Sequence, residues 1–67
     1  MELTTKLEQE LDNLSDNIIK LELFIRNPDK FDDLDPVQKK LLKVQLFSMK
    51  TYAECLVARL ELLTNKL

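Results

Sequence analysis

The chain has 67 residues, and its ten basic and twelve acidic side chains leave a formal net charge of −2. This balance gives no overall field that attracts nucleic acid or an anionic membrane. Histidine is absent and Cys55 is the single cysteine, which excludes an internal disulfide framework and argues against zinc binding and histidine-dependent catalysis. We therefore expect no enzymatic activity and no cofactor.

The composition also bounds the fold class and the cellular location. Glycine is absent and proline occurs twice, which is typical of long helices and predicts an all-α protein. The length predicts a single domain, residues 1–67, with a core that is small for a chain folding alone. No apolar run has the length of a membrane span or of a signal peptide, so we expect a cytoplasmic protein, in the host cytoplasm if a phage encodes it.

The first predicted helix covers approximately residues 3–26. Its apolar residues are spaced by four and three, the heptad pattern of a helix that packs along one stripe against a partner. Asn27 precedes Pro28, and both positions disfavour continuation of the helix. The stripe comprises Leu7, Leu11, Leu14, Ile18, Leu21 and Ile25.

The second predicted helix covers approximately residues 36–65. Asp35 suits the N-cap, Pro36 the first helical position, and Gln38 the third position of a capping-box variant. A second heptad stripe follows, with the same spacing of four and three. It comprises Leu42, Leu46, Met49, Ala53, Leu56, Leu60, Leu63 and Leu67.

The connection between these helices leaves two architectures open. A stop and a new start separated by a short segment favour an antiparallel two-helix hairpin, and a single interrupted rod is the alternative. Phe31 and Leu34 lie within this otherwise acidic segment. They are expected to fold back and plug the end of the hairpin; the alternative is that they dock onto a partner.

A lone hairpin of this sequence is expected to expose too much apolar surface. The longer second helix is expected to extend beyond the first at its C-terminal turns, and apolar residues also flank both stripes. These considerations predict a homo-oligomeric helical bundle, most simply a dimer of hairpins. The flanking residues are Ile19, Leu23, Phe24, Leu41, Val44, Phe47, Tyr52, Val57 and Leu62.

The second helix also carries a candidate ligand site. Lys43, Phe47 and Lys50 follow at helical spacing, so that an aromatic ring lies between ammonium groups, with Lys39 and Lys40 nearby. Such a face can stack a base and bind phosphate. The alternative is a solvated lysine face around a phenylalanine that oligomerisation buries. Tyr52 offers a second ring, or an interface contact.

Four stretches of the sequence, LEQELDNL, IIKLELFI, KFDDL and LLKVQLFSMKTYAECLVARL, occur in a distinctive order. They resemble a family of very small bacteriophage proteins first noted in crAss-like phages. Its pattern is a leucine-rich helix ending in L-x-x-F, then K/E-F-x-x-L, then L-L-x-x-Q-x-x-x-M-x-x-Y-x-x-x-L-x-x-R. The matching positions, spread over nearly the whole chain, are Leu21, Phe24, Lys30, Phe31, Leu34, Leu41, Leu42, Gln45, Met49, Tyr52, Leu56 and Arg59.

That family is similar in size and layout to phage hairpin sponge proteins, which oligomerise and sequester nucleotide second messengers of anti-phage systems such as CBASS and Thoeris. The resemblance implies capture of a cyclic nucleotide or an ADP-ribose-type molecule between subunits. It also adds Gln45 and Arg59 as polar candidates near an assembly interface. Two alternatives stay open: a hairpin module that inhibits or scaffolds a host or phage protein, and an RNA-binding four-helix bundle, which the acidic balance disfavours.

Overall fold

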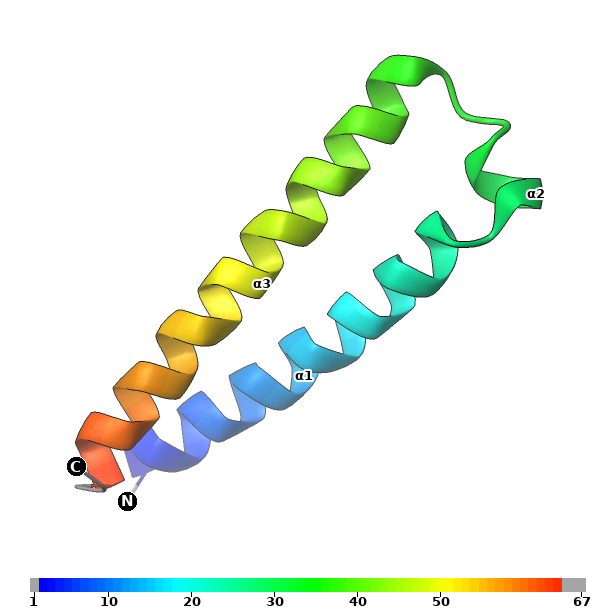
Figure 1. Cartoon of the computed structure of the whole chain (residues 1–67). Coiled ribbons are helices and arrows are strands. Elements are labelled where there is room, and N and C mark those ends of the chain that lie inside the picture. The colour runs from blue at the N-terminus through cyan, green and yellow to red at the C-terminus, as the bar shows by residue number, and fades with distance from the viewer. Residues whose placement is uncertain (1, 65–67) are drawn as a thin grey trace.

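The computed structural model describes residues 2–64 and shows an antiparallel pair of long helices (Figure 1). Helix α1 spans Glu2–Ile25, the short helix α2 spans Pro28–Phe31, and α3 spans Pro36–Thr64. The hairpin prediction is confirmed, and the interrupted rod is wrong. Helix α2 lies within the segment expected to be a plain connection. The predicted helix end at residue 65 and the stripe residue Leu67 lie outside the described residues.

The two predicted heptad stripes form the contact between α1 and α3. Leu7 is 4% exposed and Leu56 is fully buried, and the other described stripe residues are half-buried. Every described residue of both stripes is thus shielded, although a two-helix layer cannot cover them completely. The heptad spacing is responsible, because it keeps one side of each helix aimed at the other.

The connection is organised by caps at both ends and by a plug between them. Asn27 Oδ1 accepts a hydrogen bond of 3.1 Å from the Asp29 N–H, and Pro28 starts α2. Asp35 Oδ1 accepts one of 2.9 Å from the Gln38 N–H and caps α3 as predicted. Phe31 is 8% exposed. This burial confirms the plug interpretation for Phe31.

The register of the helices corrects one expectation. Leu3, near the start of α1, lines a shallow depression together with Leu62 and Leu63 of α3. The last described turns of α3 therefore lie beside the first turns of α1 and do not extend beyond them (Figure 1). The extra length of α3 lies at the connection, where Phe31 of α2 covers it. Within residues 2–64, no helix has the length and hydropathy that crossing a membrane requires.

Candidate functional site

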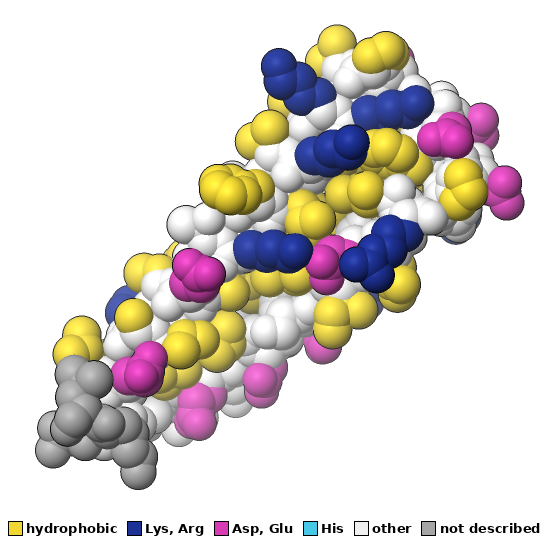
Figure 2. All heavy atoms as spheres, in the orientation of Figure 1, with side chains coloured by type: hydrophobic (Ala, Val, Ile, Leu, Met, Phe, Trp, Pro, Cys, Tyr) yellow, Lys and Arg dark blue, Asp and Glu magenta, His cyan; other side chains and the backbone are white. Residues whose placement is uncertain are grey.

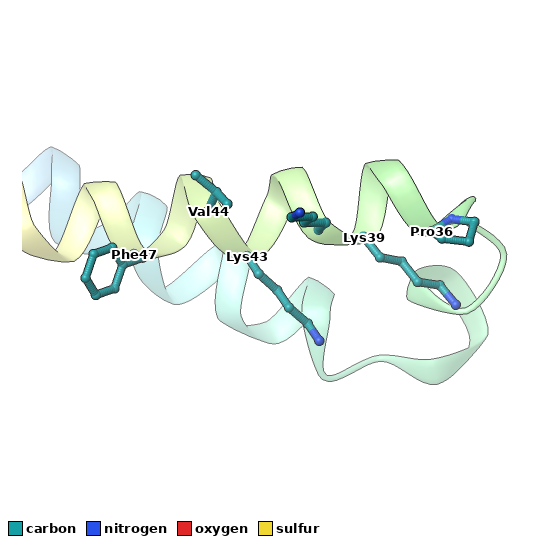
Figure 3. A pocket seen from close by; sticks show the side chains of 6 residues that line it. Pro36, Lys39, Lys43, Val44 and Phe47 are labelled. Atoms are coloured by element: carbon teal, nitrogen blue, oxygen red, sulfur yellow. The ribbon is translucent and has the colours of Figure 1, made fainter.

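A groove, here called the basic groove, lies along the first three turns of α3. Its volume is about 520 Å³ and it opens to solvent (Figure 3). Its lining combines three ammonium groups with a proline ring, a branched aliphatic side chain and an aromatic ring. The lining residues are Pro36, Lys39, Lys40, Lys43, Val44 and Phe47. The groove lies on a side of α3 that is turned away from α1: Val44 and Phe47 are exposed, whereas Leu42 and Leu46 in the same turns are half-buried.

Phe47 forms the far end of the basic groove and is the most exposed large apolar residue described, at 73%. The same ring borders a second depression of about 430 Å³, which Thr51 and Tyr52 also line. A ring exposed between two depressions offers a flat apolar platform to a planar ligand. The structure thus places Phe47 and Tyr52, both candidates from the sequence, at one continuous strip of surface.

Two of the groove lysines are oriented by the plug. The Nζ atoms of Lys39 and Lys43 lie 5.7 and 5.6 Å from the centroid of the Phe31 ring. Both side chains extend toward the connection (Figure 3). A ring face attracts cations by its quadrupole, so Phe31 holds both ammonium groups close to itself. The contact of Phe31 with Lys39 and Lys43 therefore helps to bury the ring and also positions two of the positive charges of the groove.

Lys50, a third predicted ligand residue, points to α1 instead of the basic groove. Its Nζ lies 2.9 Å from Glu22 Oε2. The hydrogen bond from Lys50 and its positive charge lower the pKa of the Glu22 carboxyl, although partial desolvation opposes the shift. The neighbouring Arg26 also lowers this pKa through its charge. In the hairpin, Lys50 thus connects the two helices.

Tyr52 makes a second polar link between the long helices. Its hydroxyl donates a hydrogen bond to Glu10 Oε2 on α1. That bond, followed by desolvation and the carboxylate charge, raises the pKa of the Tyr52 phenol. The bond fixes the ring beside the second depression, next to Phe47.

Gln45 and Arg59 lie apart from the basic groove. Gln45 is exposed, and its Nε2 lies 4.0 Å from the sulfur of Met49 on the same helix. Arg59 lines the depression near the free ends of the helices, with Leu3, Leu62 and Leu63. Of the predicted set, Lys43 and Phe47 line the basic groove, and Tyr52 lines the second depression together with Phe47. Gln45 and Arg59 line neither.

The sequence analysis placed Lys39 and Lys40 near the candidate site without assigning them to it, and it left out Pro36 and Val44. Their spacing from Phe47 contains the signal, because Lys40 precedes it by seven residues and Lys43 by four. The sequence does not show which side of α3 stays uncovered, because that depends on how α1 and α2 pack against it.

A second feature of α3 is a heptad stripe on the side facing away from α1, here called the outer seam. Its large members are 51% to 67% exposed and are Val37, Leu41, Val44 and Leu62. Its small members are also exposed and are Ser48, Thr51, Cys55 and Ala58. The spacing alternates between four and three from residue 37 to residue 62. Both depressions beside Phe47 border this stripe.

The chemistry available here is recognition of an anion next to a planar group. Lysine ammonium groups bind phosphate, and an exposed phenylalanine stacks on a base. Among residues 2–64 there is no group of three or more cysteine, aspartate or glutamate side chains that could hold a metal ion. The groove of this all-α hairpin therefore offers a surface on which an anionic planar molecule could be bound.

Comparison with protein families places the chain more specifically. Residues 1–62 match Sequestin, so the chain belongs to the Sequestin family. No curated protein and no solved structure matches it.

Proposed function

We propose that this protein sequesters a nucleotide-type second messenger of a bacterial defence system, such as CBASS or Thoeris, on behalf of a phage. Capture would be stoichiometric, with the ligand held in pockets of a homo-oligomer. The family name is consistent with sequestering a molecule. The observation that carries the proposal is the basic groove, which Lys39, Lys40 and Lys43 line together with the exposed ring of Phe47.

The groove supports this ligand class through the arrangement of its groups. The ammonium groups of Lys39 and Lys43 both lie close to the Phe31 ring, which suits a phosphate or diphosphate. Phe47 lies one helical turn beyond Lys43, within reach of a base attached to that phosphate. A neutral apolar ligand would leave the lysines without an anionic partner. A free inorganic anion would not use the ring.

Isothermal titration calorimetry with cyclic dinucleotides, cyclic trinucleotides and cyclic ADP-ribose isomers tests the proposal. At least one ligand class should bind. Phe47→Ala should weaken binding by about tenfold or more, given that stacking contributes ~1–3 kcal/mol per base. Lys43→Gln should weaken it and reduce its salt dependence. Lys6→Gln, which changes an exposed lysine paired with Glu2 on α1, is the matched control. Absence of heat with every ligand would remove the proposal.

The second candidate is a protein-binding module that inhibits or scaffolds a host or phage protein. The exposed apolar side chains of α1, Ile19 at 54% and Leu23 at 62%, favour it, because they lie away from the basic groove. A pull-down from host lysate discriminates between the candidates. Only this one expects a defined protein partner whose binding is lost in Leu23→Glu and retained in Phe47→Ala.

A further inference from the structure

The outer seam of α3 has the periodicity of a helix contact but no helix against it within residues 2–64. Its members recur at four and three residues over seven turns, the pattern that keeps one stripe of a helix against another helix. Sheet edges and flat loop surfaces do not require this spacing. The seam is therefore shaped for a helix of similar length lying along it.

We infer that the occupant is α3 of a second copy, packed antiparallel about a two-fold axis that passes near the middle of the seam. In this arrangement Leu41 faces the partner's Ala58, and Val44 faces the partner's Cys55. Large residues thus meet small ones on both sides of the axis. At the ends Val37 faces the partner's Leu62. A two-fold contact uses one surface twice, so a self-complementary stripe suffices.

The polar centre of the seam suits burial between two helices. The Thr51 hydroxyl already donates a hydrogen bond of 3.0 Å to the Phe47 carbonyl in its own helix. Burial would therefore leave no unpaired hydroxyl at this position. Thr51 faces the partner's Ser48 across the axis. These small side chains let the two helix backbones approach closely where the helices cross.

Charge selects the antiparallel orientation. Residues 36–50 of α3 contain Lys39, Lys40, Lys43 and Lys50 and no acidic residue, whereas residues 51–64 contain Glu54, Glu61 and Arg59. Figure 2 shows the dark-blue side chains gathered toward the connection end of the molecule. A parallel pair would place the two lysine clusters side by side. The antiparallel pair separates the two lysine clusters to opposite ends of the contact. Each cluster then lies beside residues 51–64 of the partner, where Glu54, Glu61 and Arg59 give a net charge of −1.

This contact adds an assembly to the proposed function. The contact itself does not require ligand capture, but its role in forming ligand pockets rests on the proposed function. The basic groove runs along the edge of the outer seam, since Val44 belongs to both. Two hairpins joined in this way carry two equivalent grooves, one toward each end of the pair, and the last turns of the partner's α3 wall each of them. The predicted stoichiometry is one ligand per chain.

Sedimentation of the protein without nucleotide tests the contact separately from ligand capture. The wild type should sediment as a dimer or a multiple of a dimer at micromolar concentration. Ser48→Arg should shift the protein toward the monomer, with helicity retained by circular dichroism because the position is exposed in the hairpin. Asn13→Arg, at an exposed position of α1, should leave the assembly intact. A monomeric wild type, or no effect of Ser48→Arg, overturns the contact.

Cysteine cross-linking tests the orientation. In the antiparallel pair the two Cys55 residues lie about 16 Å apart along the axis, beyond disulfide reach. Oxidised wild type should therefore stay uncross-linked, whereas Val44→Cys should give a disulfide to the partner's Cys55. Val44→Cys combined with Cys55→Ser should give none. A Cys55 to Cys55 disulfide in the wild type would mean parallel packing and overturn the assignment, whether or not a nucleotide binds.

Discussion

Lys50 of α3 and Glu22 of α1 form an ion pair of 2.9 Å that joins the two long helices. The sequence places these residues in different elements, and their pairing shows which turn of α3 lies beside which turn of α1. It also assigns Lys50 to the hairpin itself, although spacing alone groups Lys50 with Lys43 and Phe47. Lys50 therefore stabilises the hairpin, whereas Lys39, Lys40 and Lys43 line the candidate ligand site.

This pair predicts a pH dependence of stability. Because the folded state lowers the pKa of Glu22 below its ordinary value of 4.5, the contribution is present above that value and is lost as pH falls through the folded value. Between about pH 7 and about pH 3, the midpoint temperature of the wild type should fall more than that of Glu22→Gln. Thermal denaturation followed by circular dichroism measures both. A gap between the two proteins that stays constant with pH would contradict the pairing.

Tyr52 permits a direct optical test, because the chain has one tyrosine and no tryptophan. The hydrogen bond to Glu10 raises the phenol pKa above its ordinary value of 10.0. Absorbance titration of the phenolate should give a raised pKa in the wild type and a value closer to 10.0 in Glu10→Gln. Stability from this bond is present below the ordinary value and is lost as pH rises through the folded value. Equal titration curves for the two proteins would exclude the bond.

Leu56 is the fully buried side chain between α1 and α3. Leu56→Ala should lower the free energy of unfolding by about 2–5 kcal/mol, through lost burial and the cavity left behind. Urea denaturation measures this loss, and Leu56→Met, which keeps the volume, should lose less than about 1.5 kcal/mol. Leu23→Ala, at a residue 62% exposed in α1, is the matched surface control. Equal losses at Leu56 and Leu23 would contradict the core assignment.

Phe31 has two roles that substitutions can separate. Phe31→Leu keeps an apolar plug but removes the ring face above which Lys39 and Lys43 lie. We expect a modest loss of stability and a clear loss of ligand affinity, because the ammonium groups are no longer gathered. Leu34→Met, at the half-buried residue of the same connection, is the control and should change neither property. Unchanged affinity in Phe31→Leu would show that the ring does not organise the groove.

The cap of α3 is a local test of the connection. Asp35→Ala removes the acceptor for the Gln38 N–H and should lower the free energy of unfolding by about 1 kcal/mol. Asp35→Asn retains an acceptor oxygen and should recover most of that loss. Urea denaturation of the two variants gives the comparison. Equal stability of Asp35→Ala and the wild type would mean that the cap contributes nothing.

The two contact stripes and the cap of α3 were predictable because each depends on local spacing. Leu7 and Leu56 belong to heptads, and Asp35 precedes a proline at the first helical position. The register of α1 against α3 was not predictable, since it depends on the path of the chain through α2 and the rest of the connection. For the same reason the partner of Lys50 and the extent of the basic groove emerge only in three dimensions.

The outer seam escaped prediction for a different reason. Ser48, Thr51 and Ala58 are too small or too polar to stand out by hydropathy, although they complete the heptad spacing between Val44 and Leu62. The prediction of an oligomer rested on the total of exposed apolar residues. It gave no basis for choosing one face of α3.

Native mass spectrometry of the protein mixed with the nucleotide panel tests the central claim most directly, because it reports subunit number and bound ligand together. We expect an even number of chains, with one nucleotide mass added per chain at saturation. A single chain without added mass would contradict both the assembly and the capture of nucleotide.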